Sequence, residues 1–234
     1  MLLAKLREEV LEANLDLVRK RLVLSTFGNA SGVAREEGLI VIKASGVPYD
    51  EMELADLVVT DMQGKVVEGS LRPSSDLPTH AALYQAFPSI GGIAHTHSEY
   101  ATAWAQARKP IPCFGTTHAD HFHGAIPVTE AMTDEEINSE YEANTGAAII
   151  RTFKKTDTTA VPAVLVANHG PFAWGPDARK ASENAWMLEA IARMAYFTVG
   201  INPHAEALGK TLHDRHYLRK HGQKAYYGQV RTKE

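Results

Sequence analysis

The sequence predicts a single domain, residues 1–234, in which helices and strands alternate. Apolar residues recur at helical spacing in several segments, whereas other segments are short apolar runs of strand length. Neither a Pro/Gly/Ser-rich linker nor an internal repeat interrupts the 234 residues, of which 44% are apolar and 22% charged. We therefore expect one globular domain with a large hydrophobic core.

Composition limits the partners and the compartment. The formal net charge of -4 and the lack of a basic run argue against nucleic acid as a partner. No apolar run approaches the roughly 20 residues that cross a bilayer, and the charged N-terminal segment is unlike a signal peptide. The single cysteine, Cys113, cannot form an internal disulfide. We expect a cytoplasmic protein that binds neither nucleic acid nor membrane.

The first half of the chain begins with a predicted amphipathic helix, because apolar residues recur at steps of three and four up to residue 17. Residues 25–32 are predicted to form a turn of small residues. A strand over residues 39–43 and a tight turn over 44–46 should follow. Pro78 suits the first turn of the next helix. Residues 90–94 then predict a strand, and residues 99–106 a helix.

The second half begins with a polar loop over residues 114–124. The Thr-x-x-Glu spacing of Thr133 and Glu136 predicts a helix start, and a further helix is expected over residues 145–155. Residues 161–166 and 171–175 read as strands, and residues 177–199 as a long helix. In that helix, Trp186 and Met194 suit the core or a subunit contact. The tail carries His216, Arg219 and two tyrosines, so we expect it to dock against something. Delivery of a tyrosine to the metal site of a neighbouring subunit would fit.

Three histidines suggest a metal site. His95 and His97 stand two residues apart after a strand, a spacing that points both imidazoles to one face. Two neutral imidazoles so placed form half of a zinc site, although one could be a core residue and the other exposed. His169 follows a second apolar run and could supply a third imidazole. Asp76 is either a helix cap or a carboxylate near the metal, and such a site also accepts manganese or cobalt.

Three other segments have the chemistry of oxyanion binding. Gly28 and Gly46 lie in turns where backbone amides are unshielded. Ser74 and Ser75 precede a helix whose free N-terminal amides favour phosphate. Together these segments indicate a phosphorylated substrate.

The loop around Asp120 is a candidate for proton transfer. Asp120 lies among His118, His121 and His123, and a carboxylate held by neighbouring donors can be tuned towards working pH. At least two of these histidines are expected to be structural or exposed.

In this order, the segments resemble the class II aldolase/adducin family. The matching residues are Gly28-Asn29, Lys43-Ala44-Ser45-Gly46, Pro73-Ser74-Ser75-Asp76-Leu77-Pro78-Thr79-His80, Gly91-Gly92-Ile93-Ala94-His95-Thr96-His97, Gly115-Thr116-Thr117-His118-Ala119-Asp120, Asn168-His169-Gly170, His216-Tyr217-Leu218-Arg219-Lys220-His221-Gly222 and Ala225-Tyr226-Tyr227-Gly228-Gln229. The likeness covers nearly the whole chain. It implies an α/β fold with a central, mostly antiparallel sheet flanked by helices, and a homotetramer with active sites between subunits.

The resemblance also implies roles for individual residues. His95, His97 and His169 would hold one Zn²⁺ per subunit, with Asp76 at or near the metal. Asp120 would share acid/base work with a Tyr227 that comes from the neighbouring subunit. The positions that match substrate and phosphate contacts are Gly28, Asn29, Lys43, Ser45, Gly46, Ser74 and Ser75. The chain departs from the family pattern at Phe27, Ala44 and His121, where Trp, Pro and Tyr are familiar.

Within the family, the chain looks most like enzymes that epimerise a phosphorylated ketopentose at its fourth carbon. The expected reaction interconverts L-ribulose 5-phosphate and D-xylulose 5-phosphate by breaking and re-forming the bond between the third and fourth carbons. Zinc would act as a Lewis acid, and one acid/base group would serve each face. An aldolase that releases its fragments and an adducin-like binding module without chemistry are the alternatives. The Asp120 and Tyr227 pair argues against the first, and the three intact histidines against the second.

Overall fold

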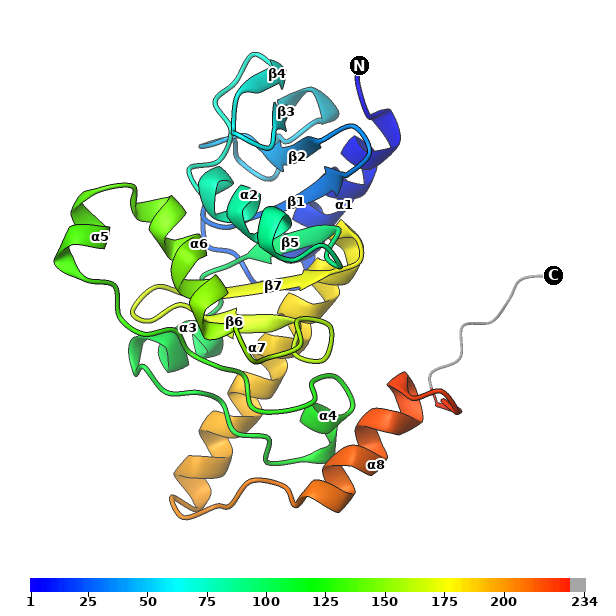
Figure 1. The fold of residues 1–234 in the computed structure, drawn as a ribbon, viewed down its shortest axis with the longest axis vertical. Coiled ribbons are helices and arrows are strands. Elements are labelled where there is room, and N and C mark those ends of the chain that lie inside the picture. The colour runs from blue at the N-terminus through cyan, green and yellow to red at the C-terminus, as the bar shows by residue number, and fades with distance from the viewer. Residues whose placement is uncertain (228–234) are drawn as a thin grey trace.

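A seven-stranded antiparallel sheet forms the centre of the molecule in the computed structural model, which describes residues 1–227 (Figure 1). The strand order is β4-β3-β2-β1-β5-β7-β6, and neighbouring strands all pair antiparallel. The strands are β1 (Asn29–Ala34), β2 (Leu39–Lys43), β3 (Leu57–Asp61), β4 (Val66–Glu68), β5 (Gly92–His95), β6 (Ala163–Leu165) and β7 (Pro171–Gly175). This arrangement confirms the sheet that the resemblance implies. Gly228 and Gln229 of the matching tail lie outside the described residues.

Helices cover both faces of the sheet (Figure 1). One face carries α2 (Leu77–Ala86) and α6 (Tyr141–Thr152), and the other carries α1 (Ala4–Arg19), α3 (Glu99–Gln106) and α7 (Ala178–Ile201). The shorter helices are η1 (Leu54–Asp56), α4 (Thr116–Ala119) and α5 (Asp134–Asn138), and α8 (Lys210–His221) packs against α4. Within residues 1–227, none of the helices combines the length and apolarity that crossing a membrane requires.

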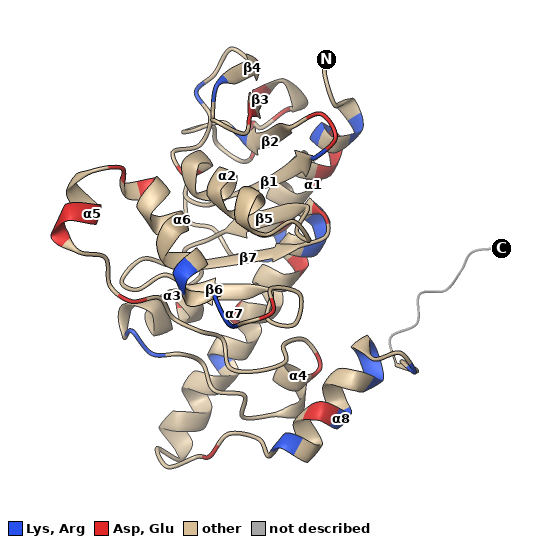
Figure 2. Cartoon of the chain, viewed as in Figure 1, with Lys and Arg blue, Asp and Glu red and all other residues tan. Residues whose placement is uncertain are grey.

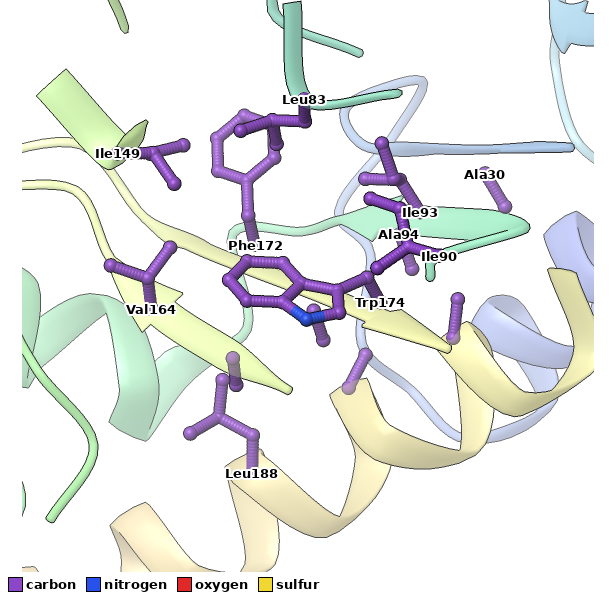
Figure 3. Close-up of a cluster of buried hydrophobic side chains, with 14 of the residues drawn as sticks. Ala30, Leu83, Ile90, Ile93, Ala94, Ile149, Val164, Phe172, Trp174 and Leu188 are labelled. Carbon is purple, nitrogen blue, oxygen red and sulfur yellow. The ribbon is translucent and has the colours of Figure 1, made fainter. Parts of the chain in front are cut away.

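The core is packed on both sides of β7 (Figure 3). Phe172 and Trp174, two residues apart, point to the same face, where the Trp174 ring lies 5.0 Å from that of Phe153 and 5.7 Å from that of Phe87, centroid to centroid. Leu188 of α7 is fully buried in the same core. Strands β1, β5 and β7 carry no charged residue, which fits their burial at the centre of the fold (Figure 2).

Most predicted elements are confirmed, but the predicted turn over residues 25–32 is wrong in its second half. Asn29 begins β1, which continues through Gly32 to Ala34. Small residues are required there because α1 packs directly on the strand: a Cβ added to Gly32 would lie 2.7 Å from Leu6 Cδ1. Such residues give no alternating apolar pattern. Strands β3 and β4 were not predicted from the sequence.

The helix start at Thr133 and the docked tail are present. The Thr133 hydroxyl accepts a hydrogen bond from the Glu136 amide, and the Glu136 carboxylate accepts one from the Thr133 amide. In the tail, α8 contacts α4 through bonds described below. Trp186 and Met194 do not enter the core, since they are 46% and 44% exposed in the single chain.

A pair of glycines brings β5 against the start of α7. A Cβ added to Gly92 would lie 2.3 Å from the Ala178 backbone nitrogen, and one added to Gly91 would lie 2.0 Å from the Pro176 carbonyl oxygen. Because these neighbours are backbone atoms, they cannot move aside without shifting an element. The glycines therefore position β5, and with it His95 at the end of the strand.

Gly92→Ala should destabilise the protein by about 1–3 kcal/mol or more, since the added methyl group overpacks against backbone. Denaturant unfolding measures the change. Gly115→Ala is the matched control, because Gly115 has an extended φ of -152° and no atom within 4 Å of an added Cβ. Equal stability of the two variants would contradict the proposed close approach.

Candidate active site

Three imidazoles converge at one edge of the sheet. His95 ends β5, His97 lies two residues later, and His169 lies in the β6–β7 loop beside Asn168, whose φ is 61°. The ring centroids are 4.8 to 5.1 Å apart. The ligand atoms of the three residues all lie within 4.8 Å of one another, and the Nε2 atoms of His95 and His97 are 3.2 Å apart. The structure thus brings together all three histidines that the sequence singled out.

Neighbouring groups orient these rings. The Nδ1 of His95 donates to the Pro171 carbonyl oxygen at 2.9 Å, which leaves Nε2 with its lone pair. The Phe172 ring stacks on His95 with centroids 4.1 Å apart. The Tyr141 hydroxyl lies 3.3 Å from His169 Nδ1. Metal-binding histidines are commonly held in this way by a hydrogen bond to the second ring nitrogen.

Two of the imidazoles, those of His97 and His169, are suited to a cation because burial favours their neutral form. Burial lowers the pKa of His169 to about 4 and also lowers that of His97. Neutral rings keep the lone pairs that a metal ion requires, and protons compete for them only under acidic conditions. Three imidazoles and a nearby carboxylate form a donor set that fits a divalent transition metal.

That carboxylate belongs to Asp76. Asp76 stands at the N-cap position of α2, yet its side chain makes no capping hydrogen bond. Instead Oδ2 accepts a bond of 2.7 Å from the Asn29 amide and lies 4.0 Å from His95 Nε2. Burial alone would raise the pKa of Asp76, but the His95 and His80 side chains and the Asn29 bond hold it below its usual value. Asp76 is therefore an ionised group that faces the histidines.

A cavity of about 380 Å³ surrounds the convergence point. It contains the eleven residues that the sequence assigned to metal or substrate binding. Its lining residues are Thr26, Phe27, Gly28, Asn29, Lys43, Ala44, Ser45, Gly46, Ser74, Ser75, Asp76, His95, His97, Tyr141, Glu142 and His169. Asp120 and Tyr227 are absent from this lining.

Backbone and side-chain bonds fasten the polar loops of the cavity together. The Ser74 backbone N–H donates to the Lys43 carbonyl oxygen at 2.9 Å, and the side-chain amide of Asn29 donates to Ser74 Oγ at 3.1 Å. Lys43 is 2% exposed, and its ammonium lies 4.8 Å from the centre of the Tyr49 ring. Burial lowers the pKa of Lys43. A buried cation beside hydroxyls and turns at positive φ, as at Gly46, forms a polar wall that suits an oxyanion.

The sequence analysis did not identify two residues that line the cavity. Tyr141 and Glu142 open α6 and reach the cavity beside His169. The Thr79 hydroxyl donates to the Glu142 carbonyl oxygen at 2.6 Å, so α2 and α6 hold this part of the wall together. No local pattern distinguishes the pair from an ordinary polar helix start, because its proximity to His169 arises only from packing.

Asp120 and Tyr227 form a separate cluster where α4 meets α8. Arg219 donates to both Asp120 oxygens, at 2.9 Å from Nε and 2.6 Å from Nη2, and His216 Nδ1 lies 3.1 Å from Oδ1. The Arg219 guanidinium also lies 4.3 Å from the centre of the Tyr227 ring. Arg219 therefore joins the two residues that the resemblance pairs as acid and base. Figure 1 shows α4 and α8 at one end of the molecule, apart from α2.

The sequence suggested that the pKa of Asp120 is raised towards neutral pH, but the structure indicates the opposite direction. Burial alone would raise its pKa, but the hydrogen bonds from Arg219 and His216 hold it below the usual carboxyl range. Asp120 is therefore a carboxylate at neutral pH, able to accept a proton. Its exposure is low, whereas Tyr227 is 51% exposed.

The three histidines around Asp120 have structural surroundings. His118 is buried and donates to the Gly124 carbonyl oxygen at 2.8 Å, and burial lowers its pKa to about 4. His121 lies 3.3 Å from the Lys220 ammonium. His123 pairs with Asp214 at 2.9 Å. None of them lines the cavity of the three converging imidazoles.

Arg219→Gln should raise the pKa of Asp120 towards the ordinary carboxyl value, because the variant loses two charge-assisted hydrogen bonds. A carbon-13 NMR titration of the Asp120 carboxyl group measures this pKa. Arg215→Gln, at an exposed position of the same helix, is the matched control and should leave the titration unchanged. An unchanged Asp120 pKa in Arg219→Gln would show that the ion pair does not control the carboxylate.

Comparison with known proteins places this geometry in a family. A profile of the Class II Aldolase and Adducin N-terminal domain matches residues 8–196. The L-ribulose-5-phosphate 4-epimerase UlaF of Salmonella typhi is 54% identical over 225 residues, 96% of this chain and 99% of that protein. An L-fuculose 1-phosphate aldolase structure superposes with a TM-score of 0.77 at 28% identity, covering 91% of this chain and 94% of that one. YgbL of Klebsiella pneumoniae superposes with a TM-score of 0.72 at 26% identity, covering 90% and 97%. The chain therefore belongs to the class II aldolase and adducin family.

Proposed function

We propose that the protein is a zinc-dependent L-ribulose-5-phosphate 4-epimerase, which interconverts L-ribulose 5-phosphate and D-xylulose 5-phosphate by breaking and re-forming a carbon–carbon bond. The observation that carries the proposal is the convergence of three imidazoles and the Asp76 carboxylate in a cavity whose other wall suits a phosphate. The name of the 54% identical relative supports the same reaction.

His95, His97 and His169 would hold the ion, with Asp76 beside it. When bound, the ion supplies the Lewis acidity that stabilises negative charge on substrate oxygens as the bond between the third and fourth carbons breaks. Lys43 and the turns at Gly28 and Gly46 would hold the phosphate. Retention of the phosphate matters because the phosphorylated fragment has to remain bound while its aldehyde group rotates and presents its other face. Recombination is then effectively intramolecular.

Two proton-transfer groups on opposite faces of the reacting carbon are required. We assign these roles to Asp120 and Tyr227. Because both lie outside the cavity of their own chain, a neighbouring chain would deliver them as one unit, joined by Arg219. The sequence resemblance assigned only Tyr227 to the neighbour. Our assignment adds Asp120.

We further propose a homotetramer in the cytoplasm with an active site at each subunit interface. Support for assembly comes from large apolar side chains that α7 leaves exposed. These are Trp186, Met194, Tyr196, Phe197 and Ile201. Exposed apolar surface of this kind marks interaction sites. The free Cys113 is compatible with a reducing compartment.

The direct test is incubation of the purified protein with L-ribulose 5-phosphate, with D-xylulose 5-phosphate and free glycolaldehyde phosphate followed together. The proposal expects D-xylulose 5-phosphate as the dominant product. Dominant release of glycolaldehyde phosphate would identify an aldolase instead. Failure to form either product would favour a binding module without chemistry.

Asp120→Asn and Tyr227→Phe should each reduce the turnover number by about 10²–10⁴-fold, the usual contribution of a general acid or base. Bound zinc should be unchanged, since neither residue lies in the metal cavity. Steady-state kinetics and metal analysis measure the two effects. Tyr226→Phe is the control, because Tyr226 is an exposed neighbour of Tyr227, and it should retain normal turnover. Normal turnover in Tyr227→Phe or Asp120→Asn would remove that residue from the mechanism.

Mixed oligomers test delivery from the neighbour. His97→Asn chains lack a complete metal cavity, and Tyr227→Phe chains lack a proton-transfer group. Co-expressed and purified together, they should regain a fraction of the wild-type activity, because some interfaces combine an intact cavity with an intact Tyr227. Mixed oligomers of His97→Asn with a His97→Asn/Tyr227→Phe double variant should stay inactive. Equal inactivity of both mixtures would place Tyr227 in the cavity of its own chain.

A further inference from the structure

A second group of metal-ligand side chains lies where α8 meets the loop after α4. His123 comes from the loop, and His213 and Asp214 come from the first half of α8. The candidate ligand atoms of these three residues lie within 4.8 Å of one another, as close as those of the cavity histidines. None of the three lines the cavity, so this group is a separate feature of the molecule.

Two close contacts hold the three side chains together. His123 Nε2 lies 2.9 Å from Asp214 Oδ1, and the His123 and His213 ring centroids are 4.9 Å apart. The Lys210 ammonium contacts the other carboxylate oxygen of Asp214, Oδ2. Oδ1 is therefore the carboxylate oxygen that faces His123, while Lys210 holds Oδ2.

The His213 imidazole is held as metal-binding histidines commonly are. His213 Nε2 donates to the Phe122 carbonyl oxygen at 3.1 Å, which leaves Nδ1 with a lone pair. The Tyr217 ring packs against His123 with centroids 4.6 Å apart and restricts its orientation. A simple His123–Asp214 ion pair would not require the second oriented imidazole. The third donor distinguishes this cluster from such a pair.

The cluster is also accessible. The side chains of His123 and Asp214 are 39% and 28% exposed, so an ion can reach them from solvent and keep water molecules in its remaining coordination positions.

We propose that His123, His213 and Asp214 form a second divalent-metal site that takes Zn²⁺ or a similar transition-metal ion. Two imidazoles and one carboxylate are typical ligands for such ions. The proposal does not depend on the epimerase function, since it shares no residue with the cavity. Its structural consequence is a clamp: a bound ion would tie α8 to the loop that directly follows Asp120.

This clamp has a consequence for Asp120. His216 and Arg219, which hold the Asp120 carboxylate, lie on the same helix within two turns of His213 and Asp214. An ion at the second site would therefore restrict the helix that positions Asp120. His123, His213 and Asp214 act here as positioning residues only.

Metal stoichiometry tests the proposal. The full-length protein is stripped with a chelator, equilibrated with buffered Zn²⁺ across a titration, and analysed for bound zinc. We expect two equivalents per chain in the wild type, and one in His97→Asn, His123→Ala and Asp214→Asn. His97→Asn/His123→Ala should bind none. His204→Ala is the matched control, because His204 is an exposed histidine outside both groups, and it should keep both equivalents.

The outcomes separate this proposal from the cavity assignment. One equivalent in the wild type and none in His97→Asn would overturn the second site and leave the cavity site standing. Loss of zinc in His123→Ala but not in His97→Asn would support the second site and overturn the cavity site. Circular dichroism confirms that each variant is folded, and Asp214→Asn provides a substitution of similar size if His123→Ala is poorly folded.

Thermal unfolding tests the clamp within the His97→Asn background, where only the second site remains. Zn²⁺ should raise the unfolding temperature of His97→Asn, because an ion that binds the folded chain stabilises it. The increase should disappear in His97→Asn/His123→Ala and persist in His97→Asn/His204→Ala. An equal increase in all three variants would show that zinc acts elsewhere.

Discussion

The pairing of His95 with its two neighbouring strands is the constraint on which the site depends. His95 lies opposite Asn29 of β1 on one side and opposite Phe172 of β7 on the other. This register brings the start of β1, the end of β5 and the loop before β7 to one point. Because a one-residue slip reverses the face of every side chain in a strand, the same register that forms the core also orients the imidazoles. Gly92 secures it by letting β5 lie against α7.

The single chain divides its chemistry between two places. The cavity contains three imidazoles, the ionised Asp76 and a polar wall around Lys43, which suit a cation and an anionic substrate. The α4–α8 end contains Asp120 and Tyr227 on either side of Arg219. Neither place alone supplies the full set of groups that the proposed epimerisation would use. The division explains why assembly and catalysis are coupled in the proposed function.

Sequence patterns predict the cavity well because its residues occur in short, chemically distinctive segments. The two-residue spacing of His95 and His97 has a direct geometric meaning on a strand. The patterns fail where tertiary packing decides. Ala30 and Gly32 form a strand because α1 needs small residues beneath it, and Tyr141 reaches the cavity only because α6 packs on α2. The pKa of Asp120 depends on Arg219, which lies 99 residues away in sequence, so its direction is not visible in the local motif.

Anomalous X-ray diffraction at the zinc absorption edge tests the central claim most directly, in crystals of the protein loaded with zinc. The account predicts a strong peak bonded to His95, His97 and His169, with Asp76 facing it and the Asp120 and Tyr227 pair of another chain across the cavity. A cavity without a zinc peak, in crystals that bind zinc elsewhere, would contradict it.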